Sequence, residues 1–471
     1  MIGLNDIIMK QFTLLFAFIV SLGNLSAQRS LTLEDCRNLA VQNNKQLQIS
    51  QERINMANNE KKAAFTKYFP QLSANGAYMW NQKDINLLDM GALTSSLSSS
   101  LGGLSQLPMV QNLISGVNDM QHLDVTNVWV GNVSLVQPVF MGGKIINYNQ
   151  ITKYAKDLAI SMNNLQLHEL LYKTDETYWQ VVSLVNKKKL ADVYVDLLRK
   201  MDGDVTNMIQ EGVATEADGL SVKVKLNEAE MAQVKVNNGL ALTRMLLSQI
   251  CGLPLDETVV LADESLEQLP VSLNERSADL NEAFMNRDEL KSLDLATKIY
   301  KRKERIVLSE MLPTVALAAN YFVTNPHVFN GFKNDFSGMF NVGVMVKVPL
   351  SGWWEGSYKR NSAKAETRIK TLELQDAKEK IELQVNQSVY KLNEANKKLI
   401  TSSRNMENAE ENLRRANFGF EEGVIPALNL MEAQTAWVSA RSTLIDAQIE
   451  LRLAEVYLKK ALGKLSVNEQ E

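Results

Sequence analysis

The chain is poor in the residues that usually carry catalysis or hold small folds together. Its 471 residues include only two cysteines and three histidines. The histidines, His122, His168 and His327, lie far apart, and no P-loop, GxSxG, HExxH or Cys-x-x-Cys motif accompanies them. We therefore expect no enzyme, metal site or cofactor. Cys36 and Cys251 could pair in an oxidising compartment, but two separate buried thiols are the favoured interpretation.

Strong charge and long apolar runs are also missing. A net charge of −4 without a clustered basic stretch gives no reason to expect nucleic acid as a partner. The apolar run Phe12–Val20 is shorter than the about 20 residues that a membrane-spanning helix needs. Because Leu25-Ser26-Ala27 follows it, the pattern predicts a signal peptide over residues 1–27 and export. No cysteine follows that cleavage site, so a lipid anchor is not expected, and any membrane insertion must use strands.

What the chain does contain is a repeat. The tripeptide Glu211-Gly212-Val213 returns 211 positions later as Glu422-Gly423-Val424. The same offset relates Pro138 to Pro349, Trp129 to Phe340, Asp218 to Asn429, and Cys251-Gly252 to Leu462-Gly463. Such self-similarity predicts an internally duplicated chain, with repeats over residues 28–277 and 278–471.

Long polar–apolar segments with helical periodicity flank both glycine tripeptides. They predict two helical hairpins, turning at about 210–215 and about 421–426, where glycine permits the positive φ of a sharp reversal. Residues 251–277 form a predicted waist segment that includes a small mixed patch. Helices are predicted over 31–69, 146–210, 216–250 and 280–311, with Pro70 and Pro313 ending the first and the last.

Four segments of about ten residues alternate with period two instead, which is typical of strands with one apolar face. In the first of them Leu72, Ala74 and Tyr78 face one way and Ser73 and Asn75 the other. The strands are expected at about 71–80, 128–138, 314–323 and 339–349. Aromatic residues expected near their loop-side ends, as in a membrane-interface girdle, are Tyr78, Trp80, Trp129, Tyr321 and Phe340. Loop 81–127 is expected to be a surface excursion that has room for a short helix at 109–117.

Ten residues suffice for a tilted strand to cross a bilayer. Open sheet edges are not tolerated in hydrocarbon, so several copies of the chain would have to pool their strands. Two copies give eight strands, whose interior side chains fill, whereas three give twelve and leave a water-filled pore. We favour three.

Two motifs and the repeat carry a family resemblance. QPVFMGG at Gln137–Gly143 and FEEGVIPALNLMEAQ at Phe420–Gln434, together with the duplicated halves, make Leu31–Leu465 resemble the TolC family of outer membrane efflux proteins. The resemblance implies a mainly α fold with transmembrane β: four β-strands per protomer in a trimeric 12-stranded outer-membrane barrel, and long hairpins forming a periplasmic α-barrel tunnel. It implies an exit duct of a tripartite efflux or type I secretion system, whose partners are a periplasmic adaptor and an inner-membrane pump.

The resemblance also implies site residues. The hairpin tips Gly212, Val213, Gly423 and Val424 would contact the adaptor. A periplasmic gate would lie beside them, at Asp218, Ser221, Asn429 and Glu432. Phe420 and Ile425 occupy family positions for a tyrosine and an arginine, so the family's hydrogen-bond and ion-pair latch does not carry over. Glu432 and Asp218 also fit a simpler role as surface carboxylates near a helix N-terminus.

Three alternatives remain open to test. Glu432 and Asp218 could be argued as paired catalytic carboxylates, but each follows a turn rather than lining a pocket. A periplasmic helical-hairpin adaptor or a structural coiled-coil protein would explain the helices, although neither explains four apolar-faced strands. The sequence does not distinguish drugs, proteins, oligosaccharides and metal ions as substrates.

Overall fold

The computed structural model describes residues 30–83, 85–86, 99–100, 108–109, 111–112, 122–123, 125–256, 259–264, 279–327 and 334–467. The predicted signal peptide, most of loop 81–127, most of the expected short helix at 109–117 and most of the waist segment lie outside these residues. The chain divides into two compact units. The sheet unit comprises Met56–Asp157 and Leu295–Thr371, and the helical unit comprises the chain up to Asn55, Leu158–Asp294 and Leu372 onward. Each unit draws on both predicted repeats, whose bounds stay a prediction.

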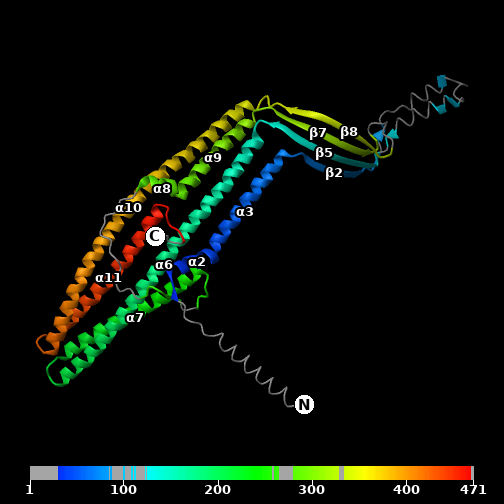
Figure 1. The fold of residues 1–471 in the computed structure, drawn as a ribbon. Coiled ribbons are helices and arrows are strands. Elements are labelled where there is room, and N and C mark those ends of the chain that lie inside the picture. The colour runs from blue at the N-terminus through cyan, green and yellow to red at the C-terminus, as the bar shows by residue number, and fades with distance from the viewer. Residues whose placement is uncertain are drawn as a thin grey trace, which may run out of the picture. The chain divides into compact units, whose positions relative to one another are not determined.

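The sheet unit is built on four long antiparallel strands, which lie side by side in Figure 1. They are β2 (Gln71–Trp80), β5 (Asn127–Met141), β7 (Thr314–Asn325) and β8 (Ser337–Lys347), in the order β2-β5-β7-β8. A further short pair joins β3 (Ile85–Asn86) to β4 (His122–Leu123). The predicted strands are thus present.

One strand boundary was wrong. The second strand was expected to end at about residue 138, but β5 continues to Met141. The register shifts between Pro138 and Phe140. Such a bulge allows a proline, which cannot donate a ladder hydrogen bond, to sit within a strand.

The two predicted hairpins are confirmed as pairs of long helices (Figure 1). The first joins α6 (Lys144–Gln210) to α7 (Glu216–Cys251), and the second joins α10 (Trp353–Glu421) to α11 (Ala427–Ala461). Within the described ranges, no helix combines the length and the apolarity of a membrane span.

The other two predicted helices are each broken once, which is a correction. Residues 31–69 form α2 (Leu33–Asn43), α3 (Lys45–Phe65) and the 3-10 turn η2 (Thr66–Tyr68), and residues 280–311 form α8 (Leu280–Asn286) and α9 (Asp288–Ser309). At the first break Asn44 is extended, and its side-chain oxygen accepts a hydrogen bond from the Gln46 N–H at 2.9 Å. The second break, at Arg287, lies 243 residues later, the same offset that relates Pro70 to Pro313.

A short parallel pair joins the start of the described chain to the waist. Here β1 (Ser30–Leu31) pairs with β6 (Val260–Leu261). Leu31 was expected to open the first helix, but that helix begins at Leu33, with Thr32 as its N-cap. The pair covers a buried cluster that contains Cys36, Tyr178 and Cys251. The predicted mixed patch is therefore present where residues 259–264 are described.

Both cysteines are free and buried, as favoured from the sequence, but they are neighbours rather than separate. The Cys251 thiol donates to the Cys36 carbonyl oxygen at 3.6 Å. The hydrogen bond with the Cys251 side chain and burial raise the pKa of Cys36. The Cys36 thiol is therefore kept protonated.

A buried ion pair ties α2 to α6 within the helical unit. The Nε and Nη2 atoms of Arg37 donate to the two carboxylate oxygens of Asp175 at 2.7 and 2.6 Å, and both side chains are almost fully buried. This two-pronged geometry satisfies both charges, which is what makes their burial tolerable.

Arg37→Met should lower the free energy of unfolding by about 3–5 kcal/mol, because it removes the arginine that pairs with the buried Asp175 carboxylate. The matched change Arg53→Met, at an exposed arginine of α3, should have little effect. The double variant Arg37→Met, Asp175→Leu should recover most of the loss. Denaturant unfolding of the four proteins measures this, and an Arg37→Met protein as stable as the parent would contradict it.

Candidate functional sites: the apolar sheet face and the hairpin tips

The four strands place their apolar residues on one common face. Hydrogen-bonded register aligns two rows across all four strands: Leu72, Leu135, Ala319 and Val342, and next to them Ala74, Val133, Tyr321 and Phe340. Because side chains alternate along a strand, residues paired in this way point to the same side of the sheet. Leu72 is 70% exposed and Val342 is 65% exposed. The sheet therefore presents a continuous uncovered apolar surface, called here the apolar sheet face.

The opposite face carries a polar row that sequence reasoning did not single out as a unit. Ser73, Ser134, Asn320 and Asn341 occupy consecutive register positions. The Ser73 and Ser134 hydroxyls lie 2.7 Å apart, and the Asn320 amide donates to the Asn341 side-chain oxygen at 3.0 Å. The alternation in each strand signalled these residues, but their pairing became visible only with the register. Polar residues thus hydrogen-bond across one face while the other is apolar.

The predicted aromatic residues gather toward the loop ends of the strands. Tyr78 pairs with Trp129 across β2 and β5, with ring centroids 4.5 Å apart, and Tyr321 pairs with Phe340 across β7 and β8. Trp80, at the end of β2, is 66% exposed. Their placement fits residues that meet both apolar and polar surroundings.

The first glycine of the QPVFMGG motif, Gly142, occupies a position that only glycine fits. Gly142 has φ +62°, and a Cβ placed there would lie 2.7 Å from the backbone oxygen of Ser309 at the end of α9. A side chain would meet both backbone strain and a fixed carbonyl. The motif therefore lets the β5–α6 turn approach α9 closely.

The two hairpin tips have the same backbone geometry. Gly212 and Gly423 adopt φ +76° and +68°. The N–H groups after them, of Val213 and Val424, bond back to the carbonyl oxygens of Met208 and Gly419 at 2.9 and 2.8 Å. Gly212 and Gly423 themselves donate to the carbonyls of Ile209 and Phe420 at 3.1 and 3.0 Å. Each tip is thus a helix end closed by a left-handed glycine in a Schellman arrangement.

Apolar packing joins the two tips to each other. A buried cluster includes Val205 of α6, Val222 of α7, Ala416 of α10 and Leu430 of α11. Phe420 and Ile425 are half-buried against this cluster. The residues at the family's latch positions thus contribute to packing within one chain. Val213 and Val424, in contrast, are 70% and 76% exposed and stand at the surface of the tips.

The structure separates the predicted gate carboxylates by their surroundings. Asp218 belongs to a capping box: its carboxylate accepts from the Thr215 N–H at 3.0 Å and from the Thr215 hydroxyl at 2.6 Å. These hydrogen bonds hold the pKa of Asp218 below its usual value, so the carboxylate stays ionised. Ser221 donates to the Ala217 carbonyl at 2.9 Å within α7.

On the second hairpin the corresponding residues are open to solvent. Asn429 and Glu432 are both exposed, three positions apart on α11 and therefore on one side of the helix. Pro426 occupies the N-cap position of α11 without a side-chain hydrogen bond. Glu432 is therefore the carboxylate of this set that is not committed to capping a helix in the described chain.

Thr215→Ala should weaken the first turn of α7 by about 1 kcal/mol, because it removes half of the capping box. Since the pKa of Asp218 is lowered on folding, its part of the stabilisation is complete above about pH 4 and is lost as pH falls through the folded value. Amide exchange of α7 at pH 7 and pH 2 should therefore show the difference from the parent shrinking in acid. Thr206→Ala, whose hydroxyl only meets the Asp202 carbonyl, is the control. An undiminished difference at pH 2 would contradict the role given to Asp218.

Comparisons with known proteins now bear on this geometry. Residues 280–464 match the family described as "Outer membrane efflux protein". Protein CyaE of Bordetella pertussis (strain Tohama I) is 22% identical over 312 residues, which is 66% of this chain and 65% of that protein's length. The chain thus spans slightly under two thirds of this curated relative.

Solved structures share the fold over nearly the whole chain. The outer-membrane channel OprN superposes with a TM-score of 0.73 at 14% identity, covering 92% of this chain and 89% of that one. The CmeC outer membrane channel of Campylobacter jejuni gives 0.72 at 12% identity, covering 93% and 87%. The second part of the chain, residues 280–464, is thus similar to the outer membrane efflux protein family, and the chain as a whole shares the fold of solved outer-membrane channels.

Proposed function

We propose that this protein is the exit duct of a tripartite efflux or type I secretion system, conducting substrates passively from the periplasm to the outside. The observation that carries the proposal is the apolar sheet face on a sheet with open edges. The edge strands β2 and β8 each pair with one neighbouring strand in the described chain. Apolar side chains exposed to water and unpaired edges exposed to lipid are both unfavourable, so the sheet needs a bilayer and further strands.

Three copies supply those strands in our proposal. The four strands have 10, 15, 12 and 11 residues, enough to cross the hydrocarbon at a tilt. Edge-to-edge pairing of β8 with β2 of the next copy would close a twelve-stranded barrel with the polar row inside. Such a barrel is wide enough to hold water, whereas eight strands would fill with side chains.

The helical hairpins of the three copies form a periplasmic tunnel in this proposal, and the chain arose by internal duplication. The equal hydrogen bonding of the two tips, 211 residues apart, supports the duplication. The exposed residues Val213 and Val424 are the contacts proposed for a periplasmic adaptor, which would connect the duct to an inner-membrane pump. A helical-hairpin adaptor or a coiled-coil protein has no use for an apolar sheet face, so detergent-free solubility of the intact protein would favour those alternatives.

Val342→Arg should block assembly into the membrane, because it places a charge in the middle of the apolar sheet face. The cost of such a charge at the bilayer midplane is about 2–4 kcal/mol per copy. Asn341→Arg, one residue away on the polar face, should still yield heat-resistant trimers. Membrane fractionation and unheated electrophoresis of both variants measure this, and equal behaviour of the two would refute the assigned faces.

Glu432 is the proposed selectivity residue of the entrance. Three copies would place a ring of these exposed carboxylates near the tips, which would attract cations and repel anions. Glu432→Ala should lower the ratio of cation to anion permeability in single-channel recordings, whereas Glu432→Asp should retain it. An unchanged ratio in Glu432→Ala would remove this residue from the gate while leaving the duct itself intact.

A further inference from the structure

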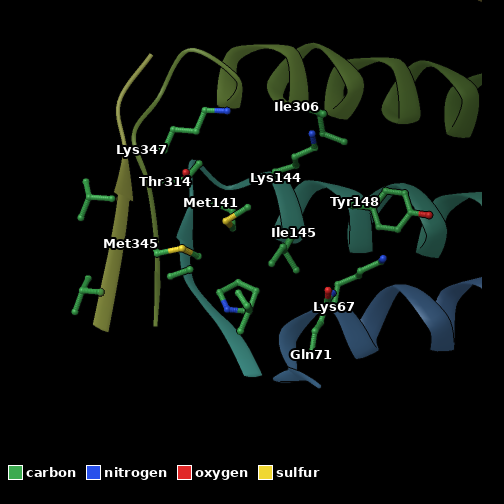
Figure 2. A pocket seen from close by; sticks show the side chains of 15 residues that line it. Lys67, Gln71, Met141, Lys144, Ile145, Tyr148, Ile306, Thr314, Met345 and Lys347 are labelled. Atoms are coloured by element: carbon green, nitrogen blue, oxygen red, sulfur yellow. The ribbon is translucent and has the colours of Figure 1, made fainter. Parts of the chain in front are cut away.

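A large cavity lies in the sheet unit, where the strands meet the helices. Its volume is about 1050 Å³, at the upper end of the range of small-molecule sites. Figure 2 shows it between the helix-side ends of the sheet and the adjoining turns of the helices. Pro138, Ala316 and Met345 are register partners in its wall. By strand alternation they lie on the same face as the polar row, opposite the apolar sheet face.

The wall of the cavity is mostly apolar. Met141 and Met345 contribute from the strands, Ile145 from the first turn of α6, and Ile306 from α9 (Figure 2). Methionines fill irregular spaces and adapt to different ligand shapes. A wall of this kind favours a ligand with an apolar body and tolerates different shapes of that body.

Three lysines from three different elements surround this wall. Lys67 comes from η2, Lys144 from the start of α6 and Lys347 from the end of β8 (Figure 2). Lys144 also contacts the Glu310 carboxylate at 3.4 Å, with both side chains half exposed. Neither Lys67 nor Lys347 has an ion pair among the described residues. Three ammonium groups against one carboxylate leave the rim of the cavity positive.

Two uncharged polar groups complete the lining. The Gln71 amide and the Tyr148 hydroxyl both belong to the cavity wall, on the side where Lys67 lies (Figure 2). Both can donate hydrogen bonds to an anionic head group. The cavity thus combines an apolar interior with a rim of donors and cations at one end of the sheet.

We propose that this cavity binds a single-chain amphiphilic anion, its apolar body against the methionines and isoleucines and its carboxylate, sulfonate or phosphate head at the lysines. The inference rests on the proposed function, because the polar face of the sheet lines the duct only if three copies close a barrel. It adds a substrate class to that function: amphiphilic anions are held at the passage from the helices to the strands.

The binding test uses the intact trimer held in an amphipathic polymer after the detergent has been removed, so that no detergent competes for the cavity. The probe is 11-(dansylamino)undecanoate, whose fluorescence rises in apolar surroundings, and the corresponding neutral amide is measured beside it. The acid should bind saturably, and the variant K67Q/K144Q/K347Q should weaken its binding at least tenfold while changing that of the amide little. The variant K62Q/K153Q/K364Q neutralises three exposed helix lysines of the same unit and should bind like the parent. Equal effects of the two triple variants, or equal affinity for acid and amide, would overturn the proposal.

A second variant separates the cavity from surface charge. Ala316→Phe places a ring inside the wall and should weaken both the acid and the amide, while the lysines remain. Single-channel conductance of the same preparation shows that it is folded. Undiminished binding by a conducting Ala316→Phe trimer would rule out the cavity as the site.

Two further measurements, of copurified lipid and of conductance, identify the source of the anion and separate the cavity proposal from the proposed function. An anionic lipid that copurifies with the parent and is lost from K67Q/K144Q/K347Q identifies a resident lipid. A lipid-free parent that binds the probe identifies an exported amphiphile. Normal conductance without probe binding refutes the cavity proposal alone, and probe binding without conductance refutes the duct alone.

Discussion

Backbone register between the four strands is the constraint on which the rest depends. Each strand alternates apolar and polar residues, but alternation defines a surface only when neighbouring strands are aligned, since a slip of one residue would exchange the two faces. The observed register collects Leu72, Leu135, Ala319 and Val342 into one row and Ser73, Ser134, Asn320 and Asn341 into another. An apolar face, a polar face and two edges follow from that one arrangement.

The sequence predicted those elements whose structure depends on neighbouring residues in the chain. Period-two alternation located β2 at Gln71–Trp80, and the glycines at 212 and 423 marked turns that need positive φ. The breaks at Asn44 and Arg287 escaped prediction because helical periodicity continues through both. Arg287 is held by the backbone oxygen of Ala461 at 3.1 Å, a partner 174 residues away. The lysines around the cavity were likewise unremarkable until the fold brought three separate strand and helix ends together.

The two hairpin tips have the same backbone geometry but different side chains at the helix starts that follow them. Both reverse through the same hydrogen-bond pattern, yet the first continues into a capping box and the second into a proline. The carboxylate of Asp218 is held in place because Thr215 donates two hydrogen bonds to it. Glu432, in contrast, is exposed on the surface of α11. The sequence proposed both carboxylates for the gate, and the hydrogen bonds of Asp218 to Thr215 now distinguish it from Glu432.

The interleaving of the two units has a consequence for how the chain folds. The helical unit combines the beginning, the middle and the end of the sequence, with the sheet unit inserted twice between them. Lys460 reaches back to Glu169 at 2.6 Å, a partner 291 residues earlier, so contacts of this unit join distant parts of the sequence. Pairings this distant in sequence form slowly, since the intervening chain must first be ordered. The helical unit should therefore complete its packing slowly, because two segments of the sheet unit separate its parts along the sequence.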